Sequence, residues 1–295
     1  MTDFTDTRLI RTFLESPILD ERKWAKAEQL PADALLVDLE DSVPPDRKEE
    51  ARERAVKVLA ESGKRGDQFL VPRINSLSSQ HCDDDIAAVS RTAAPLVAYP
   101  KLQSRGELRE VLDKFAGHGK SPGIFASIES ASGVQAVDEI AADPNVVGLL
   151  LGSADLGLDM GMPIQEAKDL SSPALRYARS RVVTAAAANN LACITMAFPK
   201  RMTDLDETRT QIYEAQRLGF TGMMTFYPPH LDLINAAFTP DDAEVKRAQE
   251  AVDVYTEARA DGRASAYLSS GDLVLAFDFE YANTILHRHR VLQKS

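Results

Sequence analysis

The fold is decided by the stretch Gly123-Ile124-Phe125-Ala126-Ser127-Ile128-Glu129, a short apolar run that ends in an acidic residue. The same pattern returns at Val146–Leu151, which is followed by Gly152-Ser153-Ala154-Asp155. One helix-sized segment separates the two runs, so they are typical of parallel strands joined by a crossover helix. Glu129 and Asp155 then stand at the same rim of the sheet, where two carboxylates can share one divalent cation.

Similar β-rich runs recur along the chain and alternate with helix-length amphipathic segments such as Ser104–Ala116, Pro173–Asn190 and Asp206–Leu218. The predicted strands are Leu9–Leu14, Ala34–Leu39, Gln68–Ile74, Leu96–Tyr99, Gly123–Ile128, Val146–Leu151, Ala192–Ala197 and Gly222–Phe226. Eight such strands favour an α/β fold of the closed (β/α)₈ type, a TIM barrel, over an open doubly wound sheet. Neither GxGxxG nor GxxxxGK[ST] occurs, so a nucleotide-binding sheet has little support.

The composition changes at Arg259–Asp272, which is rich in Gly, Ser and Ala and precedes a last amphipathic segment, Phe277–Val291. We therefore expect a catalytic barrel domain over residues 1–260 and a C-terminal helical extension over residues 261–295. The extension either packs on its own barrel or reaches an adjacent subunit.

The charge balance of the chain argues against some partners. In 295 residues, 34 Lys and Arg face 45 Asp and Glu, a net charge of −11, which argues against nucleic acid. No run approaches the apolar length of a membrane span, and Met1–Thr7 lacks the features of a signal peptide, so we expect a soluble cytoplasmic protein. The only cysteines, Cys82 and Cys193, have no metal-site spacing and are expected to be reduced and structural.

Acidic residues also gather at the end of the second predicted strand, Leu36-Val37-Asp38-Leu39-Glu40-Asp41. They either cap and solvate the following turn or act on the site, by orienting Arg73 or by holding a metal-bound water. Arg73 ends the third strand, where a guanidinium is suited to bidentate capture of a carboxylate. The simpler alternative for Arg73 is an ion pair with Glu40, and the two roles can coexist.

Lys101 ends the fourth strand in Tyr99-Pro100-Lys101 and is either a positive charge beside these acids or, with less support, a Schiff-base amine. The small residues Gly152, Ser153 and Gly157 around Asp155 leave room for a ligand to approach the backbone. Ser153 and Ala154 are assigned to substrate binding. Glu129 and Asp155, with waters and substrate oxygens, suit the octahedral shell of Mg²⁺. Salt bridging at the rim is the alternative for both.

Five motifs in order carry a resemblance that spans nearly the whole chain. They are Leu36-Val37-Asp38-Leu39-Glu40-Asp41-Ser42-Val43, Pro72-Arg73-Ile74-Asn75, Pro100-Lys101, Ile128-Glu129-Ser130-Ala131-Ser132-Gly133 and Gly152-Ser153-Ala154-Asp155-Leu156. Together they resemble the citrate lyase β-subunit-like branch of the HpcH/HpaI aldolase superfamily. The resemblance implies a TIM barrel that forms a homo-oligomer, a trimer or hexamer, and that cleaves or forms C–C bonds in citryl-, malyl- or citramalyl-CoA type substrates with Mg²⁺.

Carried over position by position, the resemblance makes Glu129 and Asp155 the metal ligands and Arg73 the arginine that binds the substrate carboxylate. Glu40 and Asp41 correspond to the acidic motif of the second strand and, with Arg73, are assigned to catalysis. Lys101 joins Arg73, Ser153 and Ala154 in substrate binding. The expected reaction is a retro-aldol or retro-Claisen cleavage of a 2-hydroxy acid, or of its CoA thioester, that releases a 2-oxo acid such as glyoxylate or pyruvate.

Three motifs depart from the family pattern. The first-strand turn reads Leu14-Glu15-Ser16-Pro17-Ile18-Leu19 and the eighth strand ends in Phe226-Tyr227-Pro228-Pro229-His230, and both weaken the case for CoA. Where relatives carry a C-terminal aspartate that acts in the adjacent subunit's site, this chain has Leu275, with Asp272 and Asp278 as the nearest acids. Because leucine cannot move a proton, two further hypotheses remain: a non-CoA aldolase or condensing enzyme, and a catalytically idle protein that binds a keto acid.

Overall fold

The computed structural model describes residues 7, 9–60, 63–65, 68–170 and 172–293. Of the stretch Met1–Thr7, on which the expectation about the N-terminus rests, only Thr7 is among the described residues. The chain divides into two compact units, residues 1–235 and 236–295. The domain boundary that the sequence suggests, at residue 260, coincides with the end of helix α11 (Asp242–Ala260). This boundary stays a prediction.

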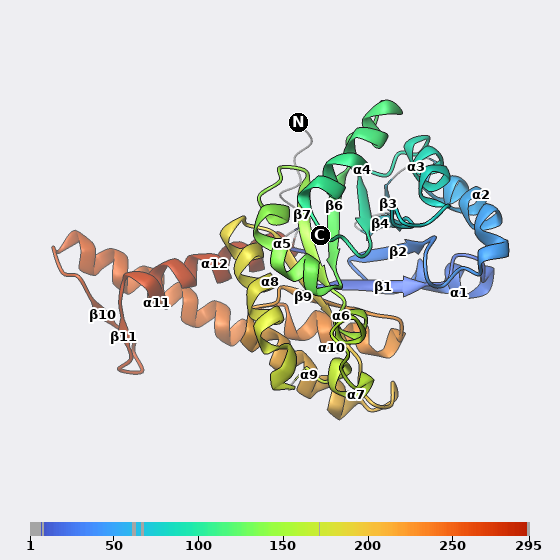
Figure 1. The fold of residues 1–295 in the computed structure, drawn as a ribbon. Coiled ribbons are helices and arrows are strands. Elements are labelled where there is room, and N and C mark those ends of the chain that lie inside the picture. The colour runs from blue at the N-terminus through green and yellow to red at the C-terminus, as the bar shows by residue number, and fades with distance from the viewer. Residues whose placement is uncertain (1–6, 8, 61–62, 66–67, 171, 294–295) are drawn as a thin grey trace. The chain divides into compact units, whose positions relative to one another are not determined.

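Eight parallel strands of the first unit form a closed ring (Figure 1). They are β1 (Thr12–Ser16), β2 (Ala34–Asp38), β4 (Gln68–Arg73), β5 (Leu96–Tyr99), β6 (Gly123–Ile128), β7 (Val146–Leu151), β8 (Ala192–Met196) and β9 (Gly222–Thr225). The ring closes because β1 pairs with both β2 and β9, while β2 pairs with β4. A short strand, β3 (Lys64–Arg65), runs antiparallel to β4. The prediction of a (β/α)₈ barrel with a C-terminal helical extension is confirmed.

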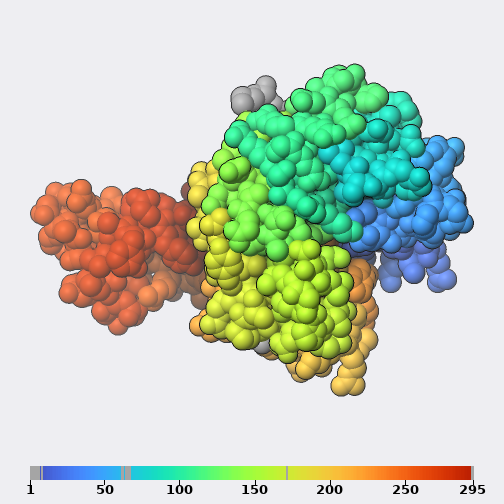
Figure 2. Space-filling view, viewed as in Figure 1, coloured from blue at the N-terminus to red at the C-terminus, as the bar shows by residue number. Residues whose placement is uncertain are grey.

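Helices follow the strands and cover the outside of the ring, and their side chains hide the strands on the face seen in Figure 2. They are α1 (Glu21–Ala27), α2 (Lys48–Leu59), α3 (Cys82–Ser90), α4 (Arg105–Gly117), α5 (Ala131–Ala141), α6 (Ser153–Asp159), α7 (Ile164–Lys168), α8 (Arg176–Ala188), α9 (Leu205–Leu218) and α10 (Leu231–Ala237). Side-chain caps begin several of these helices, as when the hydroxyl groups of Ser104 and Ser130 accept backbone N–H groups.

The predicted start of the first strand is wrong. β1 begins at Thr12 rather than Leu9, because Ile10 closes a turn onto Thr7 and the ladder with β9 starts at Thr12. Ile10 is nevertheless buried in the barrel core. Its apolar side chain made the apolar run in the sequence begin before the strand does. At its other end the strand continues through Glu15 and Ser16. The expected helix Pro173–Asn190 begins with a 3₁₀ turn, Pro173–Leu175, before α8.

Apolar side chains from all eight strands fill the barrel. The core residues are Ile10, Phe13, Ala34, Leu36, Phe69, Val71, Leu96, Ala98, Phe125, Val147, Leu150, Ala192 and Ile194, with Met224 packed against them. The rings of Phe13 and Phe125 meet edge to face with centroids 5.0 Å apart, although their strands are not neighbours. Gly148 makes room for this packing, since a Cβ atom there would lie 2.2 Å from the Phe125 ring. The barrel is therefore a packed core and not a channel.

The second unit has its own small core (orange to red in Figure 1). α11 packs with α12 (Ala276–Leu292) and with the hairpin of β10 (Ala266–Tyr267) and β11 (Leu273–Val274). Ala248, Ala251, Tyr255 and Ala258 recur at helical spacing on one face of α11 and are buried.

No helix among the described residues combines the length and the apolar character that crossing a bilayer requires. Cys82 and Cys193 are both free and buried.

Candidate functional site

A polar layer lies directly above the apolar core, at the carboxyl ends of the strands. Side chains two apart on a strand share a face, so the inward register of Phe13 continues to Glu15, that of Leu36 to Asp38, and that of Phe125 to Ser127. In the same way Val71 is followed by Arg73. The carboxyl end of the barrel, where TIM-barrel active sites lie, thus carries a cluster of ionisable groups.

Arg73 is at the centre of this cluster. Its Nε donates to Asp38 Oδ1 at 2.7 Å, and its Nη2 donates to Glu15 Oε1 at 3.2 Å. Glu40 Oε2 lies 3.4 Å from the same Nε, within ion-pair distance, although it accepts no hydrogen bond from the residues that the structure describes. Burial alone would lower the pKa of Arg73, but the hydrogen bond and charge of Asp38 outweigh it, so the pKa is raised and the guanidinium stays charged.

Asp38 holds Arg73 in place. Its side chain is fully buried, and besides Arg73 it accepts the backbone N–H groups of Glu40 at 2.9 Å and Ser42 at 2.8 Å. Burial would raise the pKa of Asp38, but these hydrogen bonds and the Arg73 charge lower it instead. Asp38 is therefore ionised and fully engaged. Arg73 pairs with this residue first and with Glu40 only at longer range, whereas the sequence suggested Glu40 as its partner.

Glu40, Asp41 and Lys101 form a second ion-pair group beside Arg73. Lys101 Nζ donates to Glu40 Oε1 at 2.8 Å and lies 3.6 Å from Asp41 Oδ1. The backbone of Lys101 has φ of 52°, a conformation that few residues other than glycine adopt. Burial would lower the pKa of Lys101, but Glu40 outweighs it and raises the pKa. The amine is therefore protonated at neutral pH and unsuited to Schiff-base formation.

Glu129 and Asp155 meet on another wall of the site. Glu129 is half-buried directly after β6, and Asp155 is exposed in the first turn of α6, directly after β7. Neither carboxylate has a hydrogen-bond or ion-pair partner in the part of the chain that the structure describes. Burial, with the negative charges of Glu40 and Asp155, raises the pKa of Glu129 to about 7.

Small residues shape the wall around these two acids. A Cβ atom on Gly152 would lie 2.4 Å from Glu129 Cγ, so the Glu129 side chain rests against the bare backbone of this glycine. Ala154 lines the site, whereas Ser153 is buried at the start of α6 and is absent from the lining.

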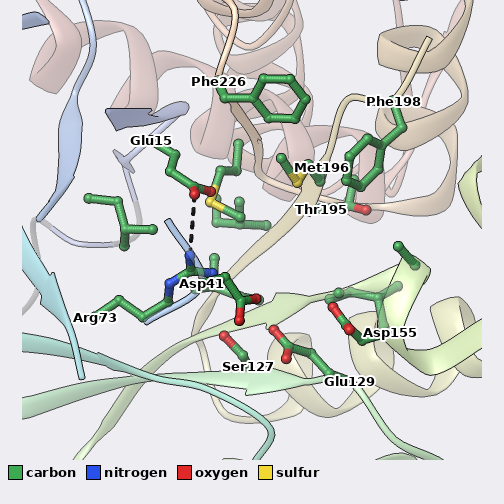
Figure 3. Close-up of a pocket in the computed structure, with 17 residues that line it drawn as sticks. Glu15, Asp41, Arg73, Ser127, Glu129, Asp155, Thr195, Met196, Phe198 and Phe226 are labelled. Atoms are coloured by element: carbon green, nitrogen blue, oxygen red, sulfur yellow. Dashed lines mark hydrogen bonds and ion pairs between the residues drawn. The ribbon is translucent and has the colours of Figure 1, made fainter. Parts of the chain in front are cut away.

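These groups surround one pocket, shown in Figure 3, where Glu129 and Asp155 lie together and Glu15 points toward Arg73 from the opposite side. The lining residues are Glu15, Leu36, Asp41, Arg73, Ser127, Glu129, Leu150, Leu151, Gly152, Ala154, Asp155, Ile194, Thr195, Met196, Phe198, Met224 and Phe226. Four carboxyl groups and one guanidinium therefore line the pocket, together with the aromatic residues Phe198 and Phe226. Such an excess of negative charge favours a bound cation.

The donor set fits Mg²⁺. No group of three or more His, Cys, Asp or Glu side chains within the described ranges is arranged to hold a metal ion. Mg²⁺, however, commonly uses one or two carboxylates and completes its shell with waters and substrate oxygens. Glu129 and Asp155 supply two hard oxygen donors that the rest of the described chain leaves free to bind. Both residues were named from the sequence alone.

Two residues of the site carry more than the sequence suggested. Glu15 was noted only as a departure near the first-strand turn, but it lies inside β1, lines the pocket and contacts Arg73. Asp38 was grouped with its neighbours and not singled out as the partner of Arg73. The period-two alternation from Phe13 and Leu36 was the available signal for both.

The C-terminal acids are engaged within their own unit. Asp272 Oδ2 accepts from Arg247 at 2.9 Å and from Ser270 at 2.8 Å, and Asp278 accepts the backbone N–H of Leu275 at 2.8 Å. Leu275 precedes the first residue of α12. These contacts explain how each acid is held, and they assign neither to the pocket of the first unit.

A closed (β/α)₈ barrel with paired carboxylates and an arginine at the carboxyl end of its strands has ionisable groups at the end where the active sites of TIM-barrel enzymes lie. Residues 16–228 match the family model described as HpcH/HpaI aldolase/citrate lyase. The chain belongs to this family, which confirms the resemblance read from the five motifs and, at the level of the family, the expectation of a lyase-class enzyme.

Relatives of known name place the chain more closely. It is 29% identical over 262 residues to a (3S)-malyl-CoA thioesterase of Cereibacter sphaeroides, covering 87% of this chain and 86% of the relative. It is 28% identical to an L-malyl-CoA/beta-methylmalyl-CoA lyase of Rhodobacter capsulatus, with 95% of each covered. The fold matches the crystal structure of CitE from Mycobacterium tuberculosis in complex with magnesium, acetoacetate and coenzyme A. The TM-score is 0.77 at 23% identity, over 95% of this chain and 97% of that chain.

Proposed function

We propose that the protein is a Mg²⁺-dependent carbon–carbon lyase that cleaves a 2-hydroxy acid, or its CoA thioester, and releases a 2-oxo acid. The observation that carries the proposal is the pairing of Glu129 and Asp155 across one pocket from Arg73. Neither carboxylate has a hydrogen-bond or ion-pair partner among the residues that the structure describes. The relative of R. capsulatus is named a lyase of malyl-CoA type, and the structural neighbour is described with magnesium and a keto acid.

Arg73 binds the carboxylate of the substrate in this proposal. Its bond to Asp38 at 2.7 Å is shorter and more deeply buried than its bond to Glu15 at 3.2 Å. A substrate carboxylate can therefore bind at Nη2 in place of Glu15, while the bond to Asp38 keeps the guanidinium oriented. Because Asp38 already holds the charged Arg73 in position, substrate binding requires little reorganisation of the site.

Glu129 and Asp155 hold the cation, and Mg²⁺ bound there supplies a Lewis acid for the oxygen on which negative charge develops. Glu40 fixes Lys101. Neither residue is among those that line the pocket, but the positive charge of Lys101 acts on the lining residue Glu129. Asp41, which lines the pocket, and Ala154 complete the wall. Ser153 is the buried first residue of α6, the helix that carries Ala154 and Asp155.

Hydrolysis of a thioester is the second candidate, because the C. sphaeroides relative is named a thioesterase. The two reactions give different products. Cleavage of malyl-CoA by a lyase yields glyoxylate and acetyl-CoA without a free thiol, whereas hydrolysis yields malate and free CoA.

The test incubates the purified protein with Mg²⁺ and either malyl-CoA, citramalyl-CoA or the free 2-hydroxy acids. We expect a 2-oxo acid, trapped as its hydrazone, and we expect EDTA to stop its release and added Mg²⁺ to restore it. A Glu129→Ala/Asp155→Ala variant that keeps its turnover and its metal affinity would overturn the proposal. Release of free thiol without any 2-oxo acid would favour the thioesterase.

Calorimetry with CoA and acetyl-CoA decides whether the substrate is a thioester. Micromolar binding would count against the non-CoA aldolase, and turnover that depends on Mg²⁺ would dispose of the catalytically idle keto-acid binder. The homo-oligomeric state, a trimer or hexamer, and a cytoplasmic location complete the proposal. Sedimentation velocity measures the oligomeric state.

A further inference from the structure

Glu15 is the carboxyl group of the pocket that the proposed function leaves without a task. Of the four acids in the lining, Glu129 and Asp155 are assigned to the metal, and Asp41 is an exposed partner of Lys101. The side chain of Glu15 is only 17% exposed and is fixed by its strand rather than by a loop. It faces the pocket from β1 and accepts a hydrogen bond from Arg73 Nη2 at 3.2 Å.

The position of this bond has a chemical consequence. If a substrate carboxylate takes the Nη2 edge of Arg73, it replaces Glu15 on that edge and leaves the Glu15 carboxyl beside the next atom of the substrate. In a 2-hydroxy acid the next atom is C2, which carries the hydroxyl group. The group that must lose its proton is then placed next to a carboxylate.

We propose that Glu15 is the general acid–base residue of the reaction, a role that rests on the proposed lyase function. In the cleavage direction the Glu15 carboxylate accepts the proton of the 2-hydroxyl group. The oxygen electron pair forms the C=O bond of the 2-oxo acid, and the pair of the breaking C2–C3 bond stays on C3 as an enolate. The Glu15 carboxylic acid then returns its proton to C3 and regenerates the carboxylate, so the proton moves from oxygen to carbon and no oxidant or reductant takes part.

The surroundings of Glu15 suit proton transfer near neutral pH. Burial raises its pKa to about 7, and the charge of Arg73 on β4 partly opposes this. Asp38 on β2, with Asp41 and Glu40 just beyond that strand, raises the pKa further. When a substrate carboxylate shares the charge of Arg73, that opposition weakens, so the bound state favours the protonated form of Glu15.

Proton uptake on binding tests this directly. Pyruvate is titrated into the Mg²⁺-saturated protein at pH 7.5 by calorimetry in two buffers that differ in ionisation enthalpy. We expect wild-type protein to take up between about half and three quarters of a proton per site, and Glu15→Gln to bind pyruvate with an uptake smaller by about that amount. Glu110→Gln, which removes an exposed carboxylate on α4, is the matched control and should behave as wild type.

The outcomes separate the two proposals. Pyruvate that binds both proteins with the same proton uptake overturns the role of Glu15 and leaves the lyase proposal standing. Pyruvate that does not bind the Mg²⁺-loaded wild type overturns the proposed function, and the role of Glu15 with it.

Turnover gives the second measurement, with the substrate that releases a 2-oxo acid. Glu15→Gln should lower kcat by about 10²–10⁴-fold with KM changed by less than about threefold, and the acidic limb of the pH profile should disappear. Glu15→Asp, which keeps the carboxyl group but shortens its reach, should restore part of the rate. Wild-type kcat in Glu15→Gln contradicts the proposal.

Discussion

Asp38 and Arg73 occupy directly paired positions of adjacent parallel strands, and their side chains form a buried ion pair of 2.7 Å. Asp38 is the last residue of β2, and Arg73 is the last residue of β4. Among the described residues, the two other ion pairs of the guanidinium are longer, with Glu15 at 3.2 Å and Glu40 at 3.4 Å. The orientation of Arg73 toward the pocket therefore depends on this pair. The position at which Arg73 can bind a substrate carboxylate depends on it too.

Removing Asp38 should unfold the barrel more easily. Asp38→Ala leaves the buried Arg73 charge without its closest partner, and we expect a loss of about 3–5 kcal/mol in the free energy of unfolding, measured by urea denaturation. The control is Asp41→Ala, whose carboxylate is 58% exposed and 3.6 Å from Lys101. Its loss should be below about 1 kcal/mol. Equal losses in the two variants would contradict a central role for the Asp38–Arg73 pair.

Glu129→Gln and Asp155→Asn should each weaken Mg²⁺ binding while leaving the fold intact. Each substitution removes one of two charged oxygen donors, so we expect an increase in the dissociation constant of at least about tenfold, measured by calorimetry. Asp113→Asn removes an exposed carboxylate on α4 and serves as the control. Unchanged affinity in both site variants would place the cation elsewhere.

Gly152→Ala tests the position of Glu129 without touching its charge. The new methyl group would lie 2.4 Å from Glu129 Cγ, so the Glu129 side chain must leave its present position and the affinity for Mg²⁺ should fall. Gly106→Ala is the matched control, because its methyl group meets only Ser104 Oγ at 3.7 Å. At that helical position alanine should stabilise by about 0.5–1 kcal/mol. Tight Mg²⁺ binding in Gly152→Ala would show that Glu129 does not need its present position.

The stability of the metal-free protein should depend on pH through Glu15. Its pKa is 4.5 in an ordinary environment and about 7 in the folded protein, because of burial. Between these values the folded state binds more protons than the unfolded state, so this residue makes stability fall as pH rises from about 4.5 to 7. Glutamine resembles the protonated form. Glu15→Gln should therefore match wild type near pH 4 and exceed it by up to about 3 kcal/mol near pH 8, in urea unfolding. A variant less stable than wild type at pH 8 would speak against the raised pKa.

Much of the barrel could be predicted because buried parallel strands are continuous apolar runs. β5, β6 and β7 have the bounds that the runs Leu96–Tyr99, Gly123–Ile128 and Val146–Leu151 indicated. The end of β1 could not be placed as well, because the strand continues through two polar residues, Glu15, which faces the site, and Ser16. Hydrophobic patterning finds the core, and it loses a strand where the strand leaves the core and enters the pocket.

The site was predicted unevenly for a related reason. Glu129 and Asp155 follow apolar runs that each end at the same rim, so alternation along the chain was enough to pair them. Glu15 and Arg73 lie on β1 and β4, and β2 runs between these strands in the closed ring. No local pattern in the sequence predicts contact between side chains that bridge an intervening strand.

The sequence by itself therefore determined the eight-stranded barrel, its helical extension and the rim where acids and Arg73 gather, because strand and helix periodicities are local properties of the chain. Only the tertiary structure decided which carboxylates neutralise Arg73 and which ones are left for a cation. Ion pairs and pKa values depend on separations of a few ångströms and on burial, and these are set when the ring closes and the strands fall into register.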